Sequence, residues 1–164
     1  MDTNEWLTRK APGFSDLSRE EQEGIAHFAF LWSLFEGRVL QGEGNPRTLV
    51  ELAEAMARDG RVDLTLFGAP LEHFRRRYWL DGSPTYFFAG LNFRRHDHRP
   101  LVESVLDGRI EGPGEVVAAL LLIVYRLRNN LFHGAKWGYG IRDQLSNFQN
   151  ANDVLMHVLE CHPL

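Results

Sequence analysis

Residues 115–132 form the segment that most constrains the fold, because they are apolar almost all the way round when drawn as a helix. The centre of this segment, from Val116 to Tyr125, contains ten consecutive apolar residues. A helix without a polar face has to be covered on every side, so it lies either in the middle of a helical bundle or at a subunit interface. Ten residues span about 15 Å as a helix, about half of a bilayer core, so we expect no membrane-spanning segment.

The rest of the sequence predicts further helices. Ser18 and Glu21 have the spacing of a capping box, and apolar residues then recur three or four positions apart until the glycines and proline of residues 41–47. Thr48 and Glu51 repeat the capping-box spacing. Further helices are predicted at residues 48–59, 70–80 (with Pro70 in the first position), 100–106 and 142–160, and residues 62–66 alternate as a short strand does. We therefore predict an all-α protein, a small bundle of four or five main helices in one domain at residues 18–164, after an irregular lead-in at residues 1–17.

Length and charge narrow the class of protein. The chain has 164 residues, the size of one domain, and its net charge of −4 argues against a protein that coats nucleic acid through bulk charge. Cys161 is the only cysteine, which argues against a disulfide framework and a cysteine-based zinc site. His96 and His98 form a possible metal pair without a clear third ligand. No secretory signal is visible, so we expect a soluble, cytoplasmic protein.

A polar cluster ends the apolar helix, in the sequence Arg128-Asn129-Asn130-Leu131-Phe132-His133. One interpretation is a helix C-terminus, where His133 and Lys136 complement the dipole and Gly134 ends the helix. The string also resembles the signature of HEPN domains, which is an Arg, usually a polar residue next, and a His after four to six intervening positions. The apolar helix before it and the sequence Trp32-Ser-Leu-Phe-Glu36 in the first predicted helix fit that resemblance.

The resemblance implies both a fold and an activity. HEPN domains are small helical bundles that commonly pair about a two-fold axis, so it implies a homodimer in which two motifs form one ribonuclease site without a metal or other cofactor. A ribose 2′-hydroxyl attacks the adjacent phosphate, with Arg128 as phosphate stabiliser, His133 as general acid or base and Asn129 beside them. Many members are toxins or phage-defence effectors. The resemblance therefore implies RNA as the substrate and a separately encoded antitoxin as a possible partner. Other members are non-catalytic modules that bind a protein, a nucleotide or RNA, and this alternative stays open.

The choice of arginine is open on geometry alone. On a regular helix, Arg126 projects within about 20° of His133, whereas Arg128 is turned away from it by about 140°. We favour Arg128, because the polar Asn129 follows it as in the signature. Asn130 and Lys136 are supporting residues, and Glu36 either pairs with one of the two arginines or is an ordinary surface carboxylate.

Basic residues and aromatic residues alternate in two further segments, His73 to Trp79 and Phe93 to Arg99. Residues 70–99 contain six Arg and three acidic residues, so their net charge is +3 in a chain that is otherwise acidic. This pattern is typical of RNA-binding surfaces and equally of solvated helix faces. The possible RNA-binding residues are Arg75, Arg76, Arg77, Arg94, Arg95 and Arg99.

Overall fold

The computed structural model describes residues 1–132 and 144–162, and this part of the chain is helical apart from one two-stranded hairpin. The elements in chain order are α1 (Thr3–Lys10), the 3-10 helix η1 (Phe14–Asp16), α2 (Arg19–Arg38), α3 (Pro46–Arg58), α4 (Leu64–Tyr78), β1 (Trp79–Leu80), β2 (Ser83–Pro84), α5 (Tyr86–Ala89), α6 (Arg99–Leu106), α7 (Pro113–Phe132) and α8 (Leu145–Glu160). The predicted all-α class is confirmed.

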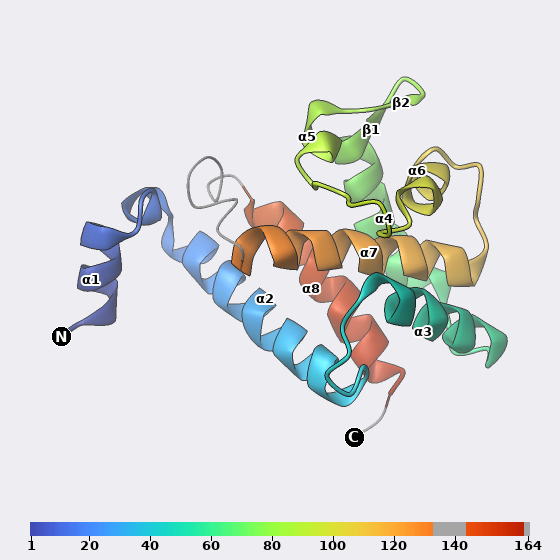
Figure 1. Cartoon of the computed structure of the whole chain (residues 1–164), viewed down its shortest axis with the longest axis horizontal. Coiled ribbons are helices and arrows are strands. Elements are labelled where there is room, and N and C mark those ends of the chain that lie inside the picture. Colours follow the sequence, from blue (N-terminus) through green and yellow to red (C-terminus); the bar gives the residue numbers. More distant parts are fainter. Residues whose placement is uncertain (133–143, 163–164) are drawn as a thin grey trace.

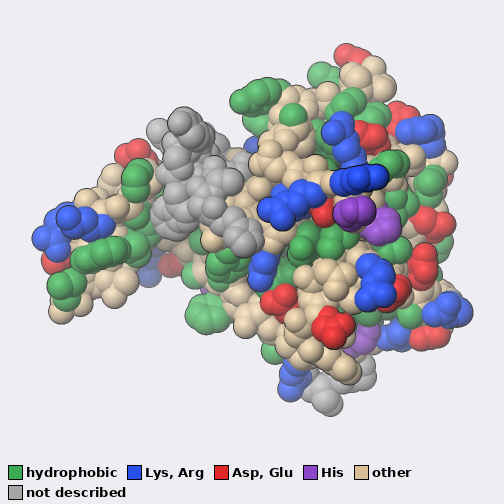
Figure 2. Space-filling view, in the orientation of Figure 1, with side chains coloured by type: hydrophobic (Ala, Val, Ile, Leu, Met, Phe, Trp, Pro, Cys, Tyr) green, Lys and Arg blue, Asp and Glu red, His purple; other side chains and the backbone are tan. Residues whose placement is uncertain are grey.

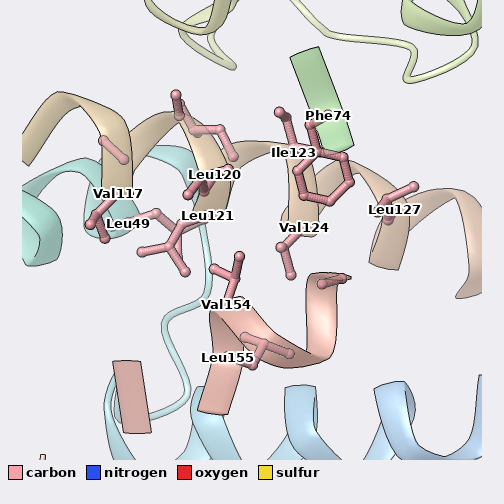
Figure 3. Close-up of a cluster of buried hydrophobic side chains, with 14 of the residues drawn as sticks. Leu49, Phe74, Val117, Leu120, Leu121, Ile123, Val124, Leu127, Val154 and Leu155 are labelled. Carbon is pink, nitrogen blue, oxygen red and sulfur yellow. The ribbon is translucent and has the colours of Figure 1, made fainter. Parts of the chain in front are cut away.

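The apolar helix α7 crosses the middle of the molecule (Figure 1), and every residue from Val116 to Val124 is buried within the single chain. Helices α3, α4, α6 and α8 pack against it. Figure 3 shows how side chains of α3, α4 and α8 meet those of α7, among them Leu49, Phe74, Val154 and Leu155. Because its own chain covers α7, the apolarity of this helix requires no partner subunit. The expectation of a homodimer therefore rests on the family resemblance alone.

The ends of α2 and α3 follow from capping. Ser18 caps α2 through a complete capping box with Glu21, as the sequence predicts. In α3 the predicted start is wrong by three residues, because the cap is Asn45, whose side chain accepts from the backbone N–H of Thr48 at 3.1 Å. Pro46 then occupies the first turn, where its missing N–H costs nothing.

Helix α4 corrects two predictions, since it begins at Leu64, where a strand was expected, and contains Pro70 in its interior. Asp63 caps it by accepting from the backbone N–H of Thr65 at 3.0 Å, which prevents the alternating residues from forming a strand. Pro70 removes the hydrogen bond to the carbonyl of Leu66, a residue at the exposed face of the helix. Burial of one continuous face, formed by Phe67, Pro70, Phe74 and Tyr78, keeps the helix intact through the proline.

The lead-in at residues 1–17 is not irregular throughout, because it contains α1 and η1. Asp2 caps α1 by accepting from the backbone N–H of Glu5, and Ala11 follows its last turn ahead of the predicted break at Pro12 and Gly13. Helix α1 buries none of its residues and lies at one end of the molecule, away from the bundle (Figure 1). None of the helices in the described residues combines the length and apolarity that a bilayer span requires.

Candidate functional site

The polar motif occupies the last two turns of α7. Four of its members, Arg126, Arg128, Asn129 and Asn130, belong to the part of the chain that the structure describes. His133 and Lys136 lie outside the described residues. The described members divide into two groups. Arg126 and Asn130 face one neighbouring segment, whereas Arg128 faces helix α2 and binds the side chain of Asn129.

Arg126 is a buried ion-pair residue, with only 4% of its side chain exposed. Its Nη1 lies 3.1 Å from Oδ2 of Asp97, and its Nε donates to the carbonyl of Leu91 at 2.9 Å. Burial lowers the pKa of the Arg126 guanidinium from its ordinary value, and the negative charge of Asp97 acts in the opposite direction. The expected pairing of Glu36 with Arg126 is therefore wrong, because Asp97 is the partner. A guanidinium held in this way is not accessible to a substrate phosphate.

Asn130 attaches the same neighbouring segment to α7. Its Nδ2 donates to the carbonyl of Gly90 at 2.9 Å, and its Oδ1 accepts from Nδ2 of Asn92 at 3.4 Å. Asp97 also accepts from the backbone N–H of Arg94 at 2.7 Å. The segment from Gly90 to Asp97 is thus fixed to the polar end of α7 at several points, although it contains no regular element.

Arg128 is the accessible arginine of the motif. Its side chain is 26% exposed, and its guanidinium lies 5.5 Å from the ring centroids of both Trp32 and Phe132. Nη1 donates to Oδ1 of Asn129 at 2.9 Å, and Nη2 lies 3.8 Å from Oε2 of Glu36, beyond hydrogen-bond distance. Nε has no hydrogen-bond partner among the described residues. Nε is buried, so the donor that remains for an anion is Nη2, which among the described residues has only the loose contact with Glu36. The guanidinium as a whole is oriented by its neighbours.

Helix α2 supplies the other side of this site. Glu36 is partly buried, and its carboxylate accepts from Nε1 of Trp32 at 3.1 Å. It also lies against Gly44, where an added Cβ would collide with the carboxylate. The expected pair of Glu36 with Arg128 is confirmed as a loose contact. The site thus contains one oriented cation, Arg128, between an aromatic ring and a carboxylate.

The predicted RNA-binding arginines have different surroundings. Arg94, Arg95 and Arg99 are exposed near the α5–α6 connection, where Arg and His side chains gather on the face shown in Figure 2. Arg99 also contacts Glu103 at 2.7 Å. Arg75 is directed inward, because its Nη2 donates to the carbonyl of Val105 at 3.0 Å, so it does not belong to an RNA-binding surface.

Sequence reasoning missed two kinds of residue. Asp97 lies between His96 and His98 in a segment without periodicity. The only signal for it is that a buried arginine requires a carboxylate as counter-charge. Tyr86 and Phe87 precede the buried Phe88 in an aromatic run, and no pattern in that run predicts that these two rings are exposed. Among the described residues, no group of three His, Cys, Asp or Glu side chains is placed to hold a metal ion.

Comparisons of the chain with protein-family models, with curated proteins and with solved structures found no match. The assignment of a function therefore depends on the motif residues and on the geometry around them.

Proposed function

We propose that this protein is a metal-independent endoribonuclease of the HEPN type, with Arg128 as the residue that contacts the scissile phosphate. The observation that carries the proposal is the contrast between the two arginines of the motif. Arg126 is buried against Asp97, whereas Arg128 is partly exposed and oriented by Trp32 and Asn129. This contrast supports the reading in which Arg128, followed by the polar Asn129, begins the signature that ends at His133.

The reaction requires no external reactant other than RNA. The 2′-hydroxyl oxygen attacks the adjacent phosphorus while a neutral His133 accepts its proton. The bond from phosphorus to the 5′-oxygen then breaks, and a protonated His133 gives a proton to that oxygen. The products end in a 2′,3′-cyclic phosphate and a 5′-hydroxyl. Charge on the non-bridging oxygens increases in the transition state, and the N–H groups of Arg128 stabilise it there.

The proposal includes a homodimer. When two motifs face each other about a two-fold axis, each subunit supplies one His133, so that one histidine acts as the base and the other as the acid. Such a composite site also removes the need for Arg128 and His133 to lie on one face of a single helix. In the cell, the chain would act as a toxin or phage-defence effector and would require a separately encoded protein to restrain it.

The test is RNA cleavage in the presence of EDTA. Purified parent protein, Arg128→Gln and the control Arg47→Gln, which removes an exposed arginine of α3, are incubated with labelled RNAs. We expect cleavage by the parent and by Arg47→Gln, and a rate lower by about 10²–10³-fold for Arg128→Gln. Equal rates for Arg128→Gln and the parent would overturn the assignment of Arg128. No cleavage by the parent of any RNA would favour the non-catalytic HEPN module instead.

A further inference from the structure

A surface groove of about 480 Å³ lies beside the last turns of α4, the hairpin and α5. The side chains that line it include His73, Arg76, Arg77, Leu80, Tyr86 and Phe87. None of the steps proposed above uses this groove. Its volume lies within the usual range of ligand sites in proteins.

The fold builds the groove by reversing the chain after α4. Strands β1 and β2 pair in antiparallel orientation, and the turn between them contains Asp81 and Gly82, both with positive φ. Thr85 then caps α5 and donates its hydroxyl to the carbonyl of Arg77 at 2.7 Å. Helix α5 is thereby fixed against the end of α4, which places its aromatic rings beside the arginines of α4.

Two aromatic rings at this groove are exposed to solvent. Tyr86 is 89% exposed and Phe87 is 52% exposed, whereas the next residue, Phe88, is buried in the core. Exposed apolar groups that gather in one place are typical of binding surfaces. The guanidinium of Arg77 lies 4.5 Å from the ring centroid of Phe87, so cation and ring already form one surface.

The charge of the groove favours an anionic ligand. Two of the lining side chains are arginines, Arg76 and Arg77, and none of those named for it is a carboxylate. Glu72 contacts Arg76 at 2.6 Å in an exposed pair that water screens, and Asp81 stands in the neighbouring turn. A ligand with negative charges and flat rings satisfies both halves of this surface.

The groove is also attached to α8 and, through α5, to the helix α7 that carries the motif. Nε2 of His73 lies 2.8 Å from Oδ1 of Asn147, near the start of α8. Asn130 of the motif holds the carbonyl of Gly90, directly after α5. The aromatic rings and the motif are therefore parts of one connected frame.

We propose that this groove binds unpaired nucleotides of RNA, with bases stacked on Tyr86 and Phe87 and phosphates bound by Arg76 and Arg77. The choice of RNA as ligand rests on the proposed function. Stacking on exposed rings requires bases that are not in a duplex, so the groove selects single-stranded RNA.

The test measures binding without cleavage. The probe is a fluorescein-labelled 2′-O-methyl oligouridine of about twelve nucleotides, within the size range of single-strand sites. It lacks the attacking hydroxyl, so fluorescence anisotropy reports binding whether or not the protein is an enzyme. The variants are Tyr86→Ala combined with Phe87→Ala, and Arg76→Gln. The matched control for the aromatic variant is Phe30→Ala, which removes an exposed ring on α2. The matched control for Arg76→Gln is Arg19→Gln, because each change removes an arginine from an exposed pair with a glutamate four positions away.

We expect the double aromatic variant to bind at least about 5- to 150-fold more weakly, which is the range for the loss of stacking on a single base. Arg76→Gln should reduce the slope of log affinity against log salt by about 0.7, the value for one phosphate contact on a single strand. Phe30→Ala and Arg19→Gln should bind as the parent does. Cleavage of ordinary RNA by the parent is measured in parallel, so failure of the enzymatic proposal is seen separately.

Three outcomes would overturn the inference. The first is unchanged binding by the double aromatic variant, even if the parent cleaves RNA. The second is equal affinity of the parent for the single strand and for a duplex of the same length. The third is no binding of the probe at all, which would leave the groove to a protein segment. Groove-dependent binding without any cleavage would support the groove and overturn the enzymatic proposal.

Discussion

The buried ion pair between Arg126 and Asp97 predicts that the two arginines of the motif respond in opposite ways to substitution. Asp97→Asn is the cleanest perturbation, because the amide keeps an oxygen for the backbone N–H of Arg94 and removes only the negative charge. The charge of Arg126 would then be buried without a counter-charge. Arg128→Gln, in contrast, removes a partly exposed side chain from a loose contact with Glu36.

The two variants are expected to lose different amounts of folding free energy. Loss of one partner from a buried pair costs about 3–5 kcal/mol, which lowers the melting temperature of a chain of this length by about 6–20 °C. Removal of Arg128 loses two cation–π contacts and a partly exposed pair, about 1–2 kcal/mol together, and about 2–8 °C. Combining Asp97→Asn with Arg126→Met should be less destabilising than the sum of the single changes, because no unpaired charge remains.

Thermal melts and cleavage rates of the same protein samples provide the assay. We expect Asp97→Asn to melt well below the parent while the rate at low temperature stays near that of the parent, and Arg128→Gln to show the reverse. A melting temperature of Asp97→Asn within about 2 °C of the parent would refute the reasoning about the buried pair. A lost rate in Arg126→Met at unchanged stability would show that Arg126 is the catalytic arginine.

Three further predictions concern other residues. His133→Ala should lower the cleavage rate by about 10²–10⁴-fold without changing the melting temperature, whereas a merely capping histidine would cost about 0.3–1 kcal/mol of stability and no activity. Burial raises the pKa of Tyr78 well above its ordinary value, so above about pH 10 the unfolded chain loses that proton first and stability falls, by at most about 1.4 kcal/mol per pH unit. Denaturation curves of Tyr78→Phe should show a weaker fall over the same pH range, and identical curves would contradict this assignment. Light scattering should give twice the mass of one chain, and a monomer at concentrations where RNA is cleaved would contradict the composite site.

The order and type of the main helices are predictable from the sequence, because local signals set them. The capping box at Ser18 and the apolar run from Val116 are local signals, because each involves only residues close together in the sequence. The structure confirms the helices that both predict. The apolarity of α7 predicts that it is covered on every side, either inside the bundle or at a subunit interface. The structure shows the first of these, because the chain itself buries Val116 to Val124.

Where the sequence prediction failed, tertiary burial outweighed a local preference. Pro70 is a strong signal for a helix start, yet burial of Phe67 and Phe74 on either side of it holds one continuous helix. The strand predicted at residues 62–66 is wrong for a different reason. Asp63 is a helix cap, and a cap at this position favours a helix over the alternation of its neighbours.

Within the site, the residue types were predictable and the pairings were not. Glu36 was a candidate partner for either arginine, and the choice depends on Asp97, which is 29 positions before Arg126 in an aperiodic segment. The groove depends on a reversal of the chain at Asp81 and Gly82 that brings residues of α4 and α5 together. The pair of Asp97 with Arg126 has no local pattern, whereas the Asp81-Gly82 turn is a local hairpin signal that the sequence prediction left out.

The chemical nature of the RNA ends tests the proposed function most directly. Purified protein is incubated in EDTA with an oligoribonucleotide of defined sequence, and the products are analysed by mass spectrometry. We predict one fragment with a 2′,3′-cyclic phosphate and one with a 5′-hydroxyl, and an uncut bond wherever the 2′-hydroxyl is replaced by hydrogen. Fragments with 5′-phosphate and 3′-hydroxyl ends, or cleavage at the 2′-deoxy position, would contradict the mechanism.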